Sequence, residues 1–192
     1  MFIERDQVPH KFEAFPKIPR LVREIVITEK LDGTNAGIHV WDDNEGNAKI
    51  AAMSRSRYLH LEHDNYGFAA WVNENQETLL WLGPGIHWGE WWGRGIQRNY
   101  GLSERRFSLF NVGRWNVDNI PPCCSVVPTL AKDTPEDEFE FSNIIEHALY
   151  ELKDGGSVAA PGFMNPEGII IYHTAASQMF KRTFENDKEG KG

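Results

Sequence analysis

Residues 25–35 are IVITEKLDGTN, and no other stretch of the chain is as informative. The β-branched run 25–28 predicts a strand that continues into Glu29 and Lys30, and Asp32-Gly33 predicts a turn directly after it. A lysine held at the end of an apolar strand can be partly desolvated and placed beside other cations, and both conditions favour a neutral amine that can attack phosphorus. Gly33 would let a ligand phosphate approach the backbone closely. Because K-x-D-G is a short motif, an exposed lysine beside a hairpin turn is the alternative explanation.

The composition is that of one soluble globular domain. The chain has 192 residues, of which 41% are hydrophobic and 25% charged, and this length is typical of a single domain. Disordered, collagen-like and disulfide-stapled classes are therefore excluded. No apolar run approaches the ~18 residues of a membrane span, and residues 1–10 are too polar for a signal peptide. Adjacent Cys123 and Cys124 suit neither a metal site nor a structural disulfide, and we expect a cytoplasmic protein.

Charge is distributed unevenly along the chain. The net charge of −8 argues against a protein that coats nucleic acid. Residues 88–114 nevertheless contain five arginines and two glutamates among several aromatic residues, whereas residues 132–154 contain eight acids and two lysines. A basic, aromatic strip on an acidic body fits an enzyme that visits a polyanion. Ordinary solvated faces explain the same charges equally well.

The pattern of apolar residues predicts more strands than helices. Strands are expected at 25–30, 36–40, 49–53, 88–92, 107–112, 167–173 and 178–184. Helical spacing predicts a short helix over 68–79 and a longer one that Thr134 caps and Gly155-Gly156 ends. Hairpin links between the strands favour an α+β fold with antiparallel sheets. With no repeat or linker, residues 1–192 are expected to form one domain, and residues 186–192 a frayed tail.

Five further motifs follow Lys30 in order. They are Ser54-Arg55-Ser56-Arg57, Trp88-Gly89-Glu90, Phe107-Ser108-Leu109-Phe110, Glu167-Gly168-Ile169-Ile170 and Phe180-Lys181-Arg182-Thr183. With this order and spacing the chain resembles the covalent nucleotidyltransferases, which include ATP-dependent RNA and DNA ligases and capping enzymes. It is most similar to the RNA ligase 2 group and its small phage-type relatives, from about residue 29 to residue 183. The resemblance implies a nucleotidyltransferase (ATP-grasp-like) adenylation domain, with antiparallel β-sheets flanked by helices.

The resemblance also implies which residues bind the nucleotide. Lys30 matches the lysine that is linked to AMP through a phosphoramidate. Glu29 and Asn35 match positions near the adenine and the phosphate or metal. Glu90 matches the acid that binds the ribose hydroxyls.

Later motifs supply the remaining implied contacts with ATP. Phe110 matches the aromatic residue that stacks on adenine, with Phe107 as the second choice. Glu167 matches the acid that supports Mg²⁺ or Mn²⁺, a cation that takes few protein carboxylates and keeps several waters. Lys181 matches the lysine that neutralises the α-phosphate. Each of these side chains has a structural alternative, in the core or on a solvated strand face.

Arginines are the candidates for contact with the polynucleotide. Arg55 matches the arginine that contacts the nucleotide and the accepting phosphate end, and Arg57 is its close rival. Arg94 and Arg98 lie in a segment rich in glycine and tryptophan, where they are candidate RNA contacts.

The chain also departs from the family pattern. Asn111 stands where many relatives have an aspartate, and Met179 stands where many have a second lysine. We expect no OB domain or helical C-terminal domain after residue 183, so a separate partner could supply that part. His60 and His63 suggest a metal site if they share a helix face, although a solvated helix start is the simpler expectation.

Together these features predict an ATP-dependent RNA ligase that acts in three nucleotidyl transfers. AMP would pass from ATP to Lys30, then to a 5′-phosphate end, and would leave when a 3′-hydroxyl attacks that end. The expected partners are ATP, Mg²⁺ or Mn²⁺, and RNA as a nicked or splinted duplex or as broken ends, with a role in RNA repair. The alternatives are an ATP-dependent DNA ligase, a capping-type guanylyltransferase and a non-catalytic RNA-binding module. A metal hydrolase built on the two histidines is a further alternative.

Overall fold

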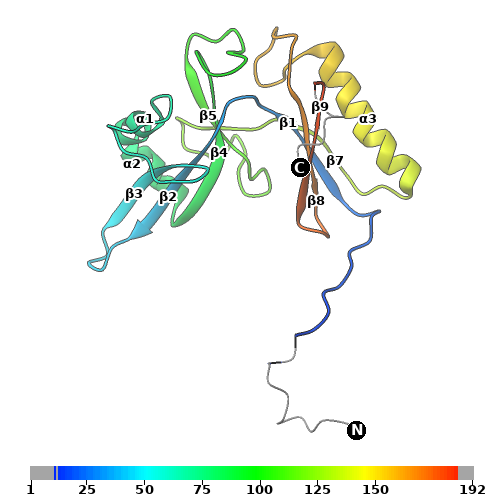
Figure 1. Cartoon of the computed structure of the whole chain (residues 1–192), viewed down its shortest axis with the longest axis horizontal. Helices are drawn as coiled ribbons and strands as arrows, with labels where there is room; N and C mark the ends of the chain where they lie inside the picture. Colours follow the sequence, from blue (N-terminus) through cyan, green and yellow to red (C-terminus); the bar gives the residue numbers. More distant parts are fainter. Residues whose placement is uncertain (1–10, 12, 186–192) are drawn as a thin grey trace.

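The computed structural model describes residue 11 and residues 13–185, which contain two sheets with helices on their outer faces (Figure 1). Sheet A is antiparallel, with the strand order β7-β1-β8-β9. Its strands are β1 (Ile25–Lys30), β7 (Thr129–Asp133), β8 (Gly168–His173) and β9 (Gln178–Thr183). Helix α3 (Glu138–Gly155) covers one face, where Leu149 and Leu152 form a core with Ile25, Ile27 and Ile169.

Sheet B has the strand order β3-β2-β4-β5-β6, antiparallel except for the last pair. Its strands are β2 (Thr34–Asp42), β3 (Ala48–Ser54), β4 (Gly85–Gly93), β5 (Arg105–Leu109) and β6 (Ser125–Val126). The short helices are α1 (Phe68–Glu74), α2 (Gln76–Leu79) and η2 (Leu80–Leu82). They cover one face of the sheet, where Phe68, Val72 and Leu79 form a core with Ile38 and Phe107.

A third, smaller core joins the two sheets. It contains Leu31, Trp92, Tyr100, Val127 and Ala160. Because the chain passes from β1 of sheet A directly into β2 of sheet B, the turn after β1 lies at this junction. The sequence stretch singled out above therefore connects the two halves of the molecule.

Most of the expected elements are confirmed, and the α+β class with largely antiparallel sheets is correct. Strands β6 and β7 were missed, and the expected helix over 68–79 is two short helices. Helix α3 begins later than predicted, because the Asp137 carboxylate, not Thr134, caps it by accepting a 2.8 Å hydrogen bond from the Glu140 N–H. Strand β5 ends at Leu109, short of the predicted end. The predicted tail, 186–192, lies outside the described residues.

Two of the sequence-based exclusions can be compared with the structure. Cys123 and Cys124 are free thiols, and burial raises the pKa of both, which keeps them protonated and unreactive. In the part of the chain that the structure describes, no helix has the length and apolar character required to cross a bilayer.

Candidate active site

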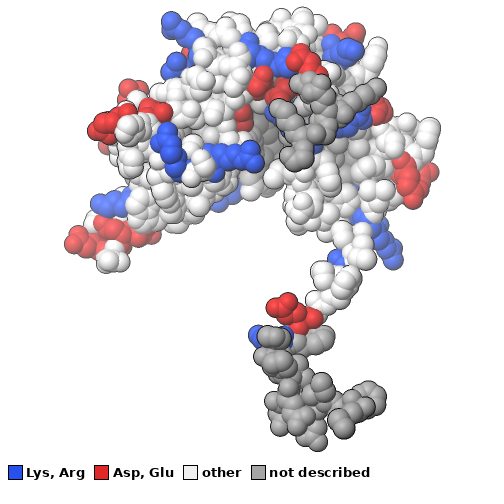
Figure 2. Space-filling model, viewed as in Figure 1, with Lys and Arg blue, Asp and Glu red and all other residues white. Residues whose placement is uncertain are grey.

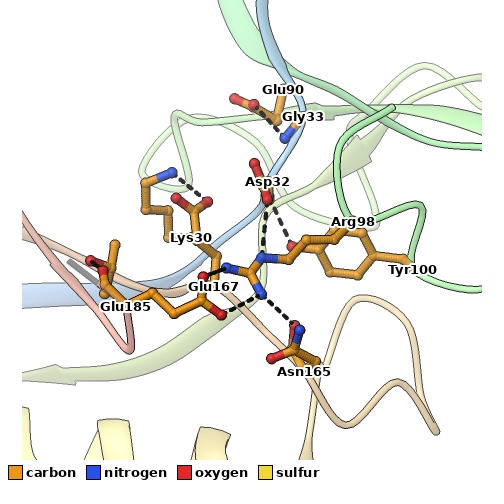
Figure 3. Close-up of polar contacts among 10 residues, drawn as sticks. Lys30, Asp32, Gly33, Glu90, Arg98, Tyr100, Asn165, Glu167 and Glu185 are labelled. Atoms are coloured by element: carbon orange, nitrogen blue, oxygen red, sulfur yellow. Dashed lines mark hydrogen bonds and ion pairs between the residues drawn. The ribbon is translucent and has the colours of Figure 1, made fainter. Parts of the chain in front are cut away.

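Lys30 is the last residue of β1 and lies at the junction of the two sheets (Figure 3). Its Nζ lies 2.5 Å from Glu167 Oε2, and the two side chains are 22% and 17% exposed. Glu167 immediately precedes Gly168, which pairs with Lys30 across β1 and β8, so the strand register brings the two side chains together. Burial raises the pKa of Glu167, while its hydrogen bond with Lys30 and the charge of Lys30 act in the opposite direction. The result is a partly desolvated amine beside a carboxylate of raised proton affinity.

Lys181 lies on the same face of sheet A as Lys30. Strand β8 separates the two strands, and Lys30 pairs with Gly168 while Lys181 pairs with Ile170. Residues two apart in a strand share a face, so both lysines lie on the face opposite α3 and the Ile169 core. The side chain of Lys181 is exposed there. Two amines on one face of a sheet suit a ligand that carries phosphate groups.

Glu90 on β4 reaches the turn that follows Lys30. Its Oε1 accepts a 3.0 Å hydrogen bond from the Gly33 N–H. Only glycine fits at position 33, because a β-carbon on that residue would lie 2.7 Å from Cβ of Trp92. Burial raises the pKa of Glu90 to about 7, although the charge of Lys30 and the Gly33 hydrogen bond oppose the shift. Near neutral pH this carboxyl group exchanges between two protonation states, so it can accept or donate a hydrogen bond.

Glu29 does not lie where the resemblance had implied. It faces the side of β1 opposite to Lys30, and its buried carboxylate accepts hydrogen bonds from the Ser157 hydroxyl at 2.6 Å and from the Val158 and Ala159 N–H groups, both at 2.9 Å. Burial raises the pKa of Glu29, and the three hydrogen bonds lower it. The side chain fastens the loop after α3 to β1, so we correct its assignment from nucleotide contact to support.

Asn35 and the two candidate phenylalanines have different surroundings. Asn35 pairs with Glu90 across β2 and β4, so the two side chains share one face of sheet B. Phe110, just after β5, is half-buried against the core that joins the sheets, with part of its ring exposed. The second choice for stacking on adenine, Phe107, is excluded because its ring is fully buried and packs against Phe68. Phe110 therefore remains the candidate.

Arg98 lies in this site as an ion-pair partner of Asp32, on the turn after Lys30. The Arg98 side chain is 15% exposed, and its Nε lies 3.0 Å from Asp32 Oδ2 in an ion pair that lacks hydrogen-bond geometry. A second ion pair joins Arg98 Nη2 to Glu185 Oε2 at 3.2 Å. The Tyr100 hydroxyl accepts a 2.8 Å hydrogen bond from the Asp32 N–H. Arg98 and Tyr100 both belong to the segment between β4 and β5, where six residues from 93 to 101 have positive φ. Arg98 therefore positions this turn, and its contact with RNA stays a prediction (Figure 3).

The other three arginines predicted to contact RNA have exposed side chains. Arg55 and Arg57 lie in the loop after β3, and Arg94 follows β4. Arg57 also donates a 2.8 Å hydrogen bond from Nη1 to the His63 carbonyl oxygen. His60 and His63 lie in a turn, not on a helix, and the described residues contain no group of three or more potential ligands that could hold a metal ion. The alternative of a metal hydrolase loses its structural basis.

The donor set next to Lys30 fits a cation held largely by nucleotide phosphates. Glu167 is a carboxylate on the face that Lys30 and Lys181 share, and no larger cluster of ligands surrounds it among the residues described. Mg²⁺ is usually held by one or two carboxylates together with phosphate oxygens and waters. Glu167 is therefore the residue that would hold such an ion.

Two residues that shape the site carry no local sequence signal. Tyr100 contacts Asp32 from 68 positions away, and Ser157 contacts Glu29 from 128 positions away. Asp32 itself was visible as part of K-x-D-G, but only as a turn residue. Long-range contacts of this kind depend on how the sheets meet, so residue type and spacing alone do not indicate them.

Comparison with known proteins places this geometry in a family. A family model described as RNA ligase matches residues 23–184. No curated protein matches the chain. Among solved structures, a variant of Naegleria gruberi RNA ligase with ATP and Mn is similar, with a TM-score of 0.60, 20% identity and coverage of 89% of this chain and 53% of that one. Another, with AMP and Mn, gives a TM-score of 0.57 at 20% identity, covering 84% and 50%. These likenesses show a shared fold, and this chain spans about half the length of those ligases.

Proposed function

The chain belongs to the RNA ligase family, and from this premise we propose that it is an ATP-dependent RNA ligase that forms a lysyl-AMP intermediate on Lys30. The observation that carries the proposal is the Lys30–Glu167 pair, a desolvated amine and carboxylate on an open sheet face that also carries Lys181. A module that only binds RNA needs no such amine. The geometry therefore favours catalysis over simple binding.

In the first step Lys30 acts as the nucleophile. One ammonium proton passes by way of Glu167, whose raised proton affinity suits this role, to solvent, and the neutral Nζ attacks the α-phosphorus of ATP. A phosphorus–nitrogen bond forms, the bond from the α-phosphorus to the bridging oxygen breaks, pyrophosphate leaves with the electron pair, and the nitrogen releases a second proton to solvent. Glu167 is then a carboxylate again. Lys181 lies on the same face to counter the charge on the α-phosphate oxygens.

In the next two steps AMP activates one RNA end and then leaves. An oxygen of a 5′-phosphate attacks the α-phosphorus of lysyl-AMP, the phosphorus–nitrogen bond breaks, and the Lys30 nitrogen takes up two protons from solvent. A 3′-hydroxyl then attacks the activated 5′-phosphorus and gives its proton to solvent. The bond from that phosphorus to the oxygen it shares with AMP breaks, and AMP leaves with the electron pair as the phosphodiester bond forms. Positioning of the reacting groups supplies most of the rate in such transfers.

Other residues near Lys30 bind and orient the nucleotide. Glu90 accepts hydrogen bonds from the ribose hydroxyls, and Phe110 offers the exposed part of its ring to adenine. Asn35, on the same face as Glu90, reaches toward the phosphates. Mg²⁺ or Mn²⁺, held by Glu167 and the phosphates, supplies further neutralisation of charge when bound.

RNA is the proposed polynucleotide, and broken or nicked ends are the proposed substrate. Exposed Arg55, Arg57 and Arg94 are available to contact phosphates of the strand. Because the similar solved ligases are about twice as long, a partner or further segment that contributes to sealing is part of the proposal.

A strand-joining assay tests this function. The protein is incubated with ATP, Mn²⁺ or Mg²⁺, and a splinted RNA nick that carries a 5′-phosphate and a 3′-hydroxyl, beside matched DNA and a GTP lane. We expect an adenylated 5′ end and joined RNA with ATP, and neither product from Lys30→Ala. Joining of DNA but not RNA, or label taken only from GTP, would contradict the proposal.

A further inference from the structure

The face of sheet B that carries Glu90 and Asn35 continues along β2 away from Lys30. Side chains alternate along a strand, so Asn35, His39 and Trp41 lie on one face, while Ile38 points to the opposite core. The surface beside the candidate active site therefore extends directly to His39 and Trp41.

Three aromatic rings stand in a row at the far end of this face. Tyr58 bridges to Met53 at the outer edge of β3, and its hydroxyl lies 2.9 Å from His39 Nδ1. The ring centroids of His39 and Trp41 are 4.9 Å apart, and those of His39 and Tyr58 are 6.1 Å apart with the rings stacked. Trp41 is 37% exposed and Tyr58 47% exposed. We call His39, Trp41 and Tyr58 the aromatic shelf.

The aromatic shelf borders an open hollow. The hollow has a volume of about 770 Å³, and its lining includes the shelf and exposed Leu61. Contiguous exposed apolar surface is uncommon on soluble proteins unless it binds something. The hydroxyl of Tyr58 lies within hydrogen-bond distance of the histidine ring, and the exposed parts of Trp41 and Tyr58 are available for stacking.

Both signs of charge surround the shelf: Glu62 lines the hollow, and two arginines lie in the loop after β3, near the start of β2. Arg55 and Arg57 are exposed in the loop that leads from β3 to Tyr58. The acids of the β2–β3 turn lie beyond the shelf, where Asp43 is 3.2 Å from Lys49. Figure 2 shows acidic side chains gathered over that turn and basic ones nearer the centre of the molecule. Rings for stacking beside arginines for phosphates are the combination by which single strands are bound.

The length of β2 sets the distance from the reacting ends. Asn35 and His39 are four residues apart, which corresponds to about 13 Å along a strand. Stacked nucleotides advance about 3.4 Å each along one strand. The shelf is thus about four nucleotides from Asn35, which the proposed function places beside the bound nucleotide.

We propose that the aromatic shelf of His39, Trp41 and Tyr58 binds unpaired nucleobases of the RNA about four nucleotides from the end being joined. This inference deepens the proposed function and rests on it. The shelf would hold the strand by stacking, independent of base identity, while Arg55 and Arg57 bind the backbone between the shelf and Lys30. A protein partner on the same surface is the competing occupant, and the experiment below separates the two.

The test measures RNA affinity of shelf variants against a matched tryptophan control. Trp81, 71% exposed on η2, lies outside the shelf, so Trp81→Ala removes the same side chain from elsewhere on the surface. Binding of a 5′-phosphorylated single-stranded RNA is followed by fluorescence anisotropy for wild type, Trp41→Ala, Tyr58→Ala and Trp81→Ala, after circular dichroism has verified each fold. We expect about a tenfold loss for each shelf variant, the loss of one base stack, and wild-type affinity for Trp81→Ala.

Photocrosslinking gives an independent measure of position. RNA with 4-thiouridine at successive positions from the 5′ end should crosslink to Trp41 or Tyr58 most strongly near the fourth nucleotide. Shelf variants that bind RNA as tightly as Trp81→Ala, or crosslinks that avoid both residues, would overturn the proposal and leave a protein partner as the competing occupant. Transfer of AMP from ATP to the wild-type protein is measured separately. If no AMP is transferred, the ligase function is refuted, and the RNA measurements alone decide whether the shelf binds RNA.

Discussion

Replacing Arg98 with alanine should destabilise the protein and slow the transfer of AMP to Lys30. The Arg98 and Asp32 side chains are 15% and 26% exposed, so their ion pair lies between a surface pair and a buried one. Surface pairs contribute about 0–1 kcal/mol, whereas breaking a buried pair costs about 3–5 kcal/mol. The second pair, to Glu185, adds little because Glu185 is 62% exposed. We therefore expect a loss of about 2 kcal/mol in the free energy of unfolding.

Urea unfolding followed by tryptophan fluorescence measures this loss, with an unchanged m-value as the check on two-state behaviour. Arg106→Ala is the matched control, because Arg106 pairs with Glu104 at 2.7 Å on the surface and its loss should change stability by less than about 1 kcal/mol. The rate of AMP transfer should fall about tenfold in Arg98→Ala, since Asp32 no longer holds the turn after Lys30 in place. An Arg98→Ala variant that is as stable as Arg106→Ala and binds RNA more weakly would refute this reasoning and favour Arg98 as an RNA contact.

Three further predictions concern the pKa of Glu90, the support of the loop after α3 and the start of that helix. The folded pKa of Glu90, about 7, lies above its ordinary value of 4.5, so the carboxylate costs stability progressively as pH rises through that interval and fully above it. Glu90→Gln should accordingly be more stable than wild type by about 1–3 kcal/mol at pH 8 and nearly equal to it near pH 4.5; a pH-independent difference in urea unfolding would argue against this. Glu29→Gln should lower the free energy of unfolding by about 1–3 kcal/mol and speed hydrogen exchange at the Val158 and Ala159 amides. Continued protection of both amides would contradict the loop's dependence on Glu29. Asp137→Ala should cost about 1 kcal/mol in thermal unfolding, with Asp137→Asn close to wild type, and equal losses in both would exclude the cap.

The local sequence predicted the elements whose signals are local. The β-branched run before Lys30 and the apolar stripe of α3 depend on strand and helix periodicity, and both are confirmed. Strand β7 was missed because Thr129–Asp133 is short, partly exposed and polar at its end, so its place beside β1 comes from sheet pairing. The start of α3 was missed because Thr134 and Asp137 are both good caps, and only the backbone geometry distinguishes them.

In the site, too, features with a local sequence signal could be predicted and contacts between distant residues could not. Lys30 forms an ion pair with Glu167, and both lie close enough to Glu90 to affect its pKa, so the structure brings these three candidate residues together. Their roles toward a nucleotide stay predictions. The correction of Glu29 follows from strand alternation: its neighbour Lys30 faces the site, so Glu29 faces away. The ion pairs of Arg98 could not be predicted, since its partners lie 66 and 87 positions away and meet it only when the sheets are joined.

The most direct test of the central claim is whether AMP becomes attached to Lys30. The folded protein is incubated with ATP and Mg²⁺ or Mn²⁺, and the intact mass and the modified peptide are determined by mass spectrometry. Lys30→Ala is measured beside Lys132→Ala, which removes a 63% exposed lysine on β7. We predict a mass increase of one AMP in wild type and in Lys132→Ala, mapped to the Lys30 peptide, labile in acid and absent from Lys30→Ala. An adduct that persists in Lys30→Ala, or folded wild-type protein that takes no AMP with either metal, would contradict the account.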